Sequence, residues 1–404
     1  MSTIAPADSP GAVAHDRKTV AEAARGWWQG VRGGELGSLP IIIGLIIIAV
    51  VFQSQNSNFL TSGNFVNLIV QAAAYMTIGM GVVFVLLLGE IDLSIGFVSG
   101  VAGVLTALLL LDDGNQLGAI PAIIIAVGAG AAIGTLHGLL ITKVGIPSFV
   151  VTLAGLLGWQ GVVLLLIGDR GTVTLQNSTV VGFANDFLPA ATSWIVLIAC
   201  VGVYAVTQIS ARMSRAKAGL PTEPDVLIVA RVAVLLVIGA VIVAVANDDR
   251  GIPYVFLVLA VLYLLWTFVL ARTKFGRYVY ATGGNAEAAR LGGVRINTVR
   301  VATFALSGAA AALAGSLDAS RVLSAQASTG SFLTFTVLTG IIVGGTSILG
   351  GEGSVPRTVL GCLFVALVAN GFNLLGLDPF YQQITLGIIL LLAVGTDAWS
   401  RRQD

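Results

Sequence analysis

The sequence predicts an all-α fold, a polytopic membrane bundle of about twelve helical spans, on three observations. Only 10% of the 404 residues are charged and 56% are hydrophobic, whereas an ordinary soluble domain carries about 25% charged residues. The apolar residues gather in runs of the length that a helix needs to cross a bilayer. The chain also contains 50 glycines, and small residues let membrane helices approach one another closely.

Twelve apolar segments are candidate spans, since a crossing helix needs about 20 mainly apolar residues. The weakest are 94–111, 193–209 and 332–349. The first and last of these are short and rich in Gly, Ser and Thr, so a broken or re-entrant helix remains an alternative to a full span for each of them. In chain order the twelve segments are 37–54, 66–89, 94–111, 118–141, 148–168, 193–209, 226–246, 253–271, 299–317, 332–349, 355–375 and 380–398.

Basic side chains predict the orientation, because Lys and Arg accumulate on the cytoplasmic side of a membrane. With the N-terminus in the cytoplasm, eighteen of the 21 basic residues fall inside and three fall outside, namely Arg170, Arg250 and Arg321. Twelve spans also return the C-terminus to the cytoplasm. We therefore expect cytoplasmic tails at 1–36 and 399–404 and a transmembrane domain at 37–398.

The order of the spans predicts two inverted halves. If the pair of spans at about 190–250 is an insertion, spans 1–5 and spans 8–12 begin on opposite sides of the membrane. Inverted five-span halves of this kind are common in transporters. No repeat of 20–50 residues is visible in the sequence, so the ten-span core with an inserted pair rests on topology alone.

The polar loop at about 272–298 is the strongest candidate for contact with another protein. Arg272–Arg300 holds six basic residues, which places it in the cytoplasm. Its centre, Asn285–Leu291, is Ala-rich and helix-prone and lies between two pairs of glycines. A short helix on such a loop suits docking into a partner's groove. The candidate contact residues are Gly283, Gly284, Asn285, Glu287, Ala288, Ala289, Arg290, Gly292 and Gly293.

The segment Gly89–Gly96 places two carboxylates between two apolar spans. Charged side chains at membrane depth are expensive and usually face a cavity or a partner. Glu90, Asp92 and Ser94 are therefore candidates for a polar hinge, a transport path or a cytoplasmic contact. A surface turn in which Asp92 caps the next helix explains the same residues equally well.

Polar residues inside the predicted spans are mostly neutral, which suits an uncharged polyhydroxylated solute. Hydrogen bonds between helices, worth about 0.6 kcal/mol on average, are the alternative explanation for each of them. His137 and Asp318 are weaker candidates, as members of a proton relay. The possible path residues are Asn67, Gln71, Thr152, Gln160, Asn370 and Asn373, with Thr77 of the same kind.

Several function classes find no support in the sequence. A P-loop needs Gly-Lys-Ser/Thr, but the four lysines follow Arg17, Thr142, Ala216 and Thr273. The Gly-rich run Gly344–Ser354 also has no lysine in the required place and is interpreted as a tight turn. We find no metal-ligand spacing and no nucleophile–base pair, so no metal, cofactor or catalytic residue is expected. With a net charge of +1, the bulk charge gives no support for a nucleic-acid partner, and none is expected.

The two cysteines, Cys200 and Cys362, fall inside apolar runs. Free cysteine behaves as a small hydrophobic residue. Both are therefore predicted to be buried and unpaired.

Five segments together resemble the permease subunits of bacterial monosaccharide ATP-binding-cassette (ABC) importers, the ribose/xylose/arabinose/galactose group. They occur in the order typical of that family, from about residue 40 to the end. The segments are Gly89–Gly96, Val144–Gly155, Phe275–Gly292, Gly344–Ser354 and Asn370–Leu375.

The resemblance implies an all-helical permease in the bacterial plasma (inner) membrane that pairs with a second copy of itself. A cytoplasmic ABC ATPase would bind its inner face, and a sugar-binding protein would deliver the solute outside. Gly283 to Gly293 resembles the ATPase-docking loop of such permeases. Shorter ribose-type permeases lack the stretch at about 190–250, whereas xylose-type permeases carry a comparable one, which implies a pentose such as D-xylose.

Three alternatives remain at this point. The same mechanism serves other sugars and branched-chain amino acids within the superfamily. A proton-coupled sugar symporter would use Glu90, Asp92 or His137 as its proton site. An integral membrane enzyme is the third, and no constellation in the sequence supports it.

Overall fold

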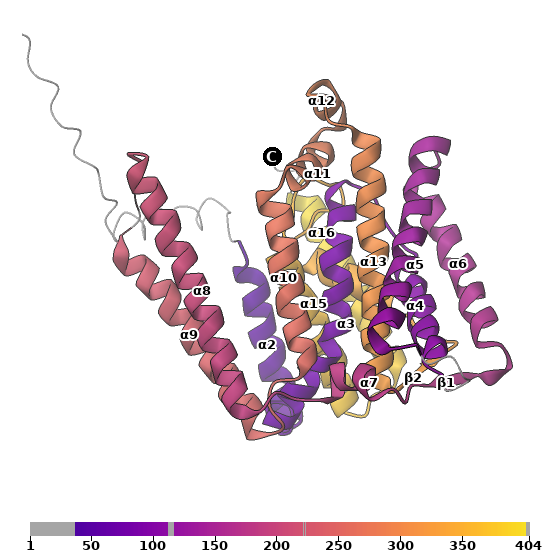
Figure 1. Ribbon diagram of the computed structural model, residues 1–404, viewed down its shortest axis with the longest axis horizontal. Coiled ribbons are helices and arrows are strands. Elements are labelled where there is room, and N and C mark those ends of the chain that lie inside the picture. Colours follow the sequence, from indigo (N-terminus) through magenta and orange to yellow (C-terminus); the bar gives the residue numbers. More distant parts are fainter. Residues whose placement is uncertain (1–36, 112–116, 221, 223, 401–404) are drawn as a thin grey trace, which may run out of the picture. The chain divides into compact units, whose positions relative to one another are not determined.

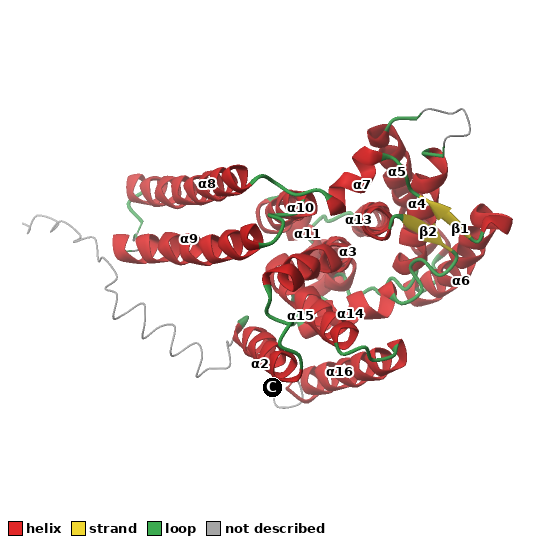
Figure 2. Cartoon of the chain, turned by 90° about the horizontal axis from the view of Figure 1, so that it is seen from below, coloured by secondary structure: helices red, strands yellow, loops and turns green. Residues whose placement is uncertain are grey.

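The computed structural model describes residues 37–111, 117–220, 222 and 224–400, and the side chains only as far as residue 395. The predicted N-terminal tail at 1–36 and most of the C-terminal tail at 399–404 lie outside the described residues. The described chain is built from helices, with two short strands (Figures 1 and 2).

Apolar helices coincide with all twelve predicted spans in the described part of the chain. Eight are long and apolar enough to cross a membrane, and four are shorter, namely α2, α4, α14 and α16. The twelve are α2 (Leu39–Gln55), α3 (Ser62–Leu87), α4 (Ile95–Leu109), α5 (Ala119–Leu139), α6 (Ser148–Ile167), α8 (Ala190–Lys217), α9 (Asp225–Asp248), α10 (Tyr254–Arg272), α13 (Ile296–Val322), α14 (Leu333–Val343), α15 (Val355–Leu374) and α16 (Pro379–Ser400). The polytopic helical fold is confirmed, and the number of full crossings stays a prediction.

Short elements connect the apolar helices. Strands β1 (Thr172–Thr174) and β2 (Ser324–Gln326) pair antiparallel, with Val173 opposite Ala325. The remaining elements are a π-helical turn (Leu140–Val144), a 3₁₀ turn (Gly168–Arg170), α7 (Ser178–Asn185), α11 (Lys274–Gly284) and α12 (Ala286–Leu291).

The chain divides into two compact units. Of the described residues, one unit comprises 38–111, 117–188 and 246–400, and the other comprises 37, 189–220, 222 and 224–245. The second unit holds α8 and nearly all of α9, whose facing ends are joined by an ion pair between Arg212 and Asp225. The boundaries of this unit lie near those of the predicted insertion at 190–250.

The core of the larger unit forms around α3 and α13. Within the apolar windows of these two helices, 72% and 61% of residues are buried. Helix α13 packs against α3, α4 and α5, and α3 packs in turn against α13, α14 and α15. Each is the second apolar helix of its half and is followed by a short one, α4 with 15 residues or α14 with 11. Helix α3 of the first half thus packs on α14 and α15 of the second half, and α13 of the second half packs on α4 and α5 of the first. This reciprocal packing supports the inverted arrangement of the two halves.

Glycines allow the closest of these helix contacts. Gly130, Gly134 and Gly138 recur at every fourth position of α5 and face α13. A Cβ atom at Gly134 would overlap the carbonyl oxygen of Phe304, and one at Gly138 would lie 2.7 Å from the Cα of Val301. A spacing of four places small residues on one helix face, where backbones can meet. The glycine content was therefore a valid sign of membrane helix packing.

Two details differ from the sequence-based expectations. The predicted span 332–349 is helical only from Leu333 to Val343, because Gly344 and Gly345 end the helix and Gly345 takes a left-handed φ of 82°. Cys362 is buried as predicted, but Cys200 is exposed. The reason is that only 11% of the apolar window of α8 is buried inside the chain.

Candidate functional site

The predicted docking segment folds as two short helices, α11 and α12, and α12 projects beyond the ends of its neighbours (Figure 1). The Asn285 side chain caps α12 by accepting a hydrogen bond from the Ala288 N–H at 2.9 Å. Glu287 and Arg290 form an ion pair at 2.6 Å, with side chains 65% and 66% exposed. Ala289 faces inward at 7% exposure, whereas Leu291 is 79% exposed. The outer face of α12 thus presents a charged pair beside an apolar side chain.

A backbone contact fastens this segment to the ends of two other helices. A Cβ at Gly283 would overlap the carbonyl oxygen of Leu87, the last residue of α3. The same oxygen accepts a hydrogen bond from the Gly351 N–H at 2.9 Å. Three glycine-containing segments that lie far apart in the sequence therefore meet at one point, which we call the glycine junction (Gly283, Leu87 and Gly351).

Tyr280 adds a side-chain bond to the glycine junction. Its hydroxyl donates a hydrogen bond to the carbonyl oxygen of Gly353 at 2.7 Å. Burial raises the pKa of Tyr280, against a smaller lowering effect of Arg357. The hydroxyl therefore keeps its proton and remains a donor that ties α11 to the loop 344–354.

The segment Gly89–Gly96 leads from the C-terminal end of α3 into α4. Glu90 pairs with Arg300 of α13 at 3.0 Å, and its side chain is 12% exposed. Asp92 is buried at 2% exposure, so the interpretation as a surface turn is wrong for this residue. Its position beside the first turn of α4 helps to stabilise the carboxylate, because a helix N-terminus carries partial positive charge.

A chain of hydrogen bonds satisfies the Asp92 carboxylate. One oxygen accepts from the Ser94 hydroxyl at 2.6 Å, and the other accepts from the Ser307 hydroxyl of α13 at 2.9 Å. Ser94 Oγ lies 3.4 Å from His137 Nδ1, and Trp159 Nε1–H donates to His137 Nε2 at 3.1 Å. Because Nε2 accepts, the neutral ring carries its proton on Nδ1 and donates it toward Ser94. The chain links α4, α5, α6 and α13.

The N-terminal ends of α4 and α14 meet inside the core. The Gly96 N–H donates to Thr334 Oγ1 at 3.0 Å, and this hydroxyl donates to the Leu93 carbonyl at 3.1 Å. A Cβ at Gly330 would overlap the carbonyl oxygen of Gly96. Short helices whose N-termini converge are a recurring feature of inverted-repeat transporters.

The six predicted path residues do not form one cluster. Asn370 joins Gln71 at 3.3 Å and also bonds with Asn64, a residue that the sequence reasoning missed, at 3.0 Å. Asn67 is exposed and accepts from Arg250 at 2.7 Å. Thr152 is buried, and its hydroxyl donates to the Ser148 carbonyl at 2.9 Å.

Gln160 and Asn373 are exposed, on α6 and α15 respectively. Most of the six residues therefore hydrogen-bond to another residue of the protein or are exposed. This outcome agrees with the alternative explanation, in which polar residues within the spans form hydrogen bonds between helices.

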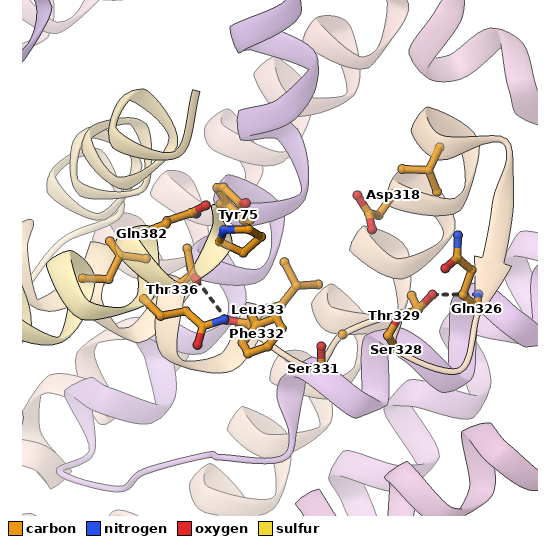
Figure 3. A pocket seen from close by; sticks show the side chains of 15 residues that line it. Tyr75, Asp318, Gln326, Ser328, Thr329, Ser331, Phe332, Leu333, Thr336 and Gln382 are labelled. Atoms are coloured by element: carbon orange, nitrogen blue, oxygen red, sulfur yellow. Dashed lines mark hydrogen bonds between the residues drawn. The ribbon is translucent and has the colours of Figure 1, made fainter. Parts of the chain in front are cut away.

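A cavity of about 340 Å³ lies elsewhere, where α13 ends and α14 and α16 begin (Figure 3). In the predicted orientation these ends are on the outer side of the membrane. The lining residues are Tyr75, Asp318, Val322, Gln326, Ser328, Thr329, Gly330, Ser331, Phe332, Leu333, Thr336, Pro379, Gln382, Gln383 and Leu386. We call this the outer cavity.

The sequence reasoning named only Asp318 of this set, as a proton-relay candidate. A usable signal was the density of Gln, Ser and Thr before the short apolar segment, together with Gln382-Gln383 inside the span predicted at 380–398.

Comparisons with known proteins match almost the whole chain. The family described as "Branched-chain amino acid transport system / permease component" matches residues 64–394. The Xylose transport system permease protein XylH of Escherichia coli (strain K12) is 33% identical over 380 residues, covering 94% of this chain and 96% of that protein. XylH of Haemophilus influenzae is 33% identical, with 91% and 98% covered.

The Ribose import permease protein RbsC of Escherichia coli (strain K12) is 27% identical over 358 residues, covering 88% of this chain and 92% of that protein. No solved structure matches the chain.

Proposed function

This chain belongs to the branched-chain amino acid transport system / permease component family, and on that premise we propose that it is the membrane-spanning permease subunit of an ABC importer for a monosaccharide, D-xylose. One observation carries the choice of solute. Identity to the xylose permease is 33% over 94% of the chain, against 27% for the ribose permease over 88%. The protein is a multi-pass protein of the bacterial plasma membrane and a translocation subunit.

The energy for transport comes from a separate cytoplasmic ABC ATPase in this proposal. Helix α12 is the docking element, with Glu287, Arg290 and Leu291 offered to the partner. A charged pair beside an exposed apolar side chain suits a groove that buries the leucine and fixes the register through charge. The glycine junction then carries displacement of α12 to the end of α3 and to the loop after α14.

Two further partners belong to the proposal. A sugar-binding protein delivers the solute to the outer surface, and a second copy of the chain completes the permease. The resemblance of five sequence segments to monosaccharide permeases supports both, as do the xylose and ribose permeases among the relatives.

The rival functions receive less support. A proton-coupled symporter would need a carboxylate free to exchange protons, whereas Glu90 is paired with Arg300 and Asp92 accepts bonds from two serine hydroxyls. Amino-acid import is named in the family description, but the relatives that cover most of the chain are named for sugars.

Replacing Glu287 with lysine tests the docking role. The substitution turns the pair with Arg290 into a repulsion and reverses the charge offered to the partner. We expect the affinity of the permease for its ATPase to fall by about tenfold, which corresponds to about 1.4 kcal/mol. The affinity is measured with the permease in nanodiscs and the purified ATPase.

Lys143→Glu is the matched control, since it reverses an exposed charge on another predicted cytoplasmic loop. Unchanged ATPase affinity in Glu287→Lys, or an equal loss in Lys143→Glu, would contradict the docking role of α12.

A further inference from the structure

The outer cavity has the size and position of a small-molecule site. Its volume of about 340 Å³ is at the lower end of the roughly 300–1,000 Å³ range of ligand pockets. It draws residues from the middle of α3, the end of α13, the loop that enters α14 and the first turns of α16. Figure 3 shows Tyr75 and Gln382 on one side and Asp318 with Gln326 on the other. Such a volume has room for one small ring.

Several polar side chains around the cavity are available to a ligand. Gln326, Ser328, Ser331 and Gln382 make no side-chain hydrogen bond to any described residue, whereas the Thr336 hydroxyl donates to the Phe332 carbonyl at 2.9 Å. A glutamine amide offers two donors and one acceptor, and a serine hydroxyl both donates and accepts. This mixture matches adjacent hydroxyl groups, each of which is also both donor and acceptor.

Asp318 adds one charged acceptor. Its Oδ1 accepts from Arg321 Nε at 3.0 Å and from Nη2 at 2.9 Å. Oδ2 makes no hydrogen bond to a described residue. Hydrogen bonds to a carboxylate are stronger than those between neutral groups, so Oδ2 would hold one hydroxyl firmly. The neighbouring arginine neutralises the carboxylate, and the cavity therefore does not select a cation.

Apolar side chains complete the lining. Tyr75, Phe332 and Leu386 lie among the polar groups. A sugar ring has polar edges and less polar C–H faces, whereas an amino acid carries two opposite charges. Asp318 lines the cavity and is already paired at 2.9 Å with Arg321, which does not line it. The cavity thus lacks separate partners for an ammonium and a carboxylate group.

We propose that the outer cavity is a binding site for one monosaccharide within the permease, with Gln382, Ser331 and Asp318 holding its hydroxyl groups. The inference rests on the proposed import function and adds to it the place where the solute is held. Gly330 forms the inner boundary of the site, since it lines the cavity and packs against Gly96 of α4. The meeting point of α4 and α14 therefore bounds the cavity at Gly330.

Binding of D-xylose to the full permease in nanodiscs, measured by saturation-transfer NMR, tests the site. We expect transfer to the sugar in the unchanged protein and its loss in Gln382→Ala. Ser328→Leu is a second variant, at an exposed position, that adds bulk to the cavity without removing a bond. Gln55→Ala is the control, since Gln55 is exposed at the predicted outer end of α2 and does not line the cavity. It should retain transfer.

Uptake by the complete complex, with ATPase and sugar-binding protein, is the second readout. At saturating binding protein, the maximal rate of xylose uptake should fall at least fivefold in both cavity variants and remain unchanged in Gln55→Ala. Normal binding and uptake in folded Gln382→Ala and Ser328→Leu would overturn the site and leave the import function intact. An unchanged complex that imports no xylose would instead overturn the import function itself.

Discussion

Gly283→Val is expected to uncouple ATP hydrolysis from solute uptake. The new side chain would overlap the carbonyl oxygen of Leu87 and approach the Gly351 N–H, at 2.8 Å from the Cβ position alone. Overpacking of this kind costs about 1–3 kcal/mol. The segment that carries α12 must then move away from the end of α3, or the new side chain must push Gly351 and Leu87 apart. The docking face of α12 itself is unchanged, so the ATPase still binds and hydrolyses ATP.

The measurement compares the two rates in vesicles that contain the complete complex. Xylose uptake per ATP hydrolysed should fall at least tenfold in Gly283→Val. Gly158→Val is the matched control, because a Cβ at Gly158 meets nothing within 4 Å. If Gly283→Val imports xylose with the ordinary ratio, the glycine junction does not transmit motion from α12.

Gly134→Val should markedly lower the stability of the folded protein. The α5–α13 contact brings the backbones together, and a Cβ at Gly134 would lie 2.7 Å from the carbonyl carbon of Phe304 and overlap its oxygen. Neither helix can move away without opening the packed core around α13. The cost, about 1–3 kcal/mol or more, is a large part of the 5–15 kcal/mol that stabilises a typical protein.

Gly128→Val on the same helix is the control, since a Cβ there meets open space. The yield of monodisperse protein in detergent and its melting temperature should both fall for Gly134→Val and stay unchanged for Gly128→Val. Equal stability of the two variants would contradict the close backbone contact between α5 and α13.

Much of the fold could be predicted from the sequence because its causes are local. Hydropathy and length predicted all twelve apolar helices, and flanking glycines with an Ala-rich centre predicted α12. The end of α14 at Val343 was missed because Ile348 and Leu349 resume the apolar pattern after only four residues, so an averaged hydropathy window still reaches them. Hydropathy cannot detect that two glycines stop the helix first.

The candidate sites depended on contacts between distant parts of the chain. Asp92 is bonded to Ser307, a residue 215 positions away, and nothing near Asp92 in the sequence indicates that partner. The outer cavity similarly joins Tyr75 to Gln382. Polarity within a span did not by itself identify the residues of an internal site, since Asn67 and Gln160 are as polar as Gln71 but are exposed.

The most direct measurement is the accumulation of labelled D-xylose in sealed vesicles that contain the purified permease. Accumulation should require the ATPase, the sugar-binding protein and hydrolysable ATP together, and a protonophore should leave it unchanged. Accumulation by the permease alone, or its collapse when the protonophore is added, would contradict an importer that depends on a separate ATPase.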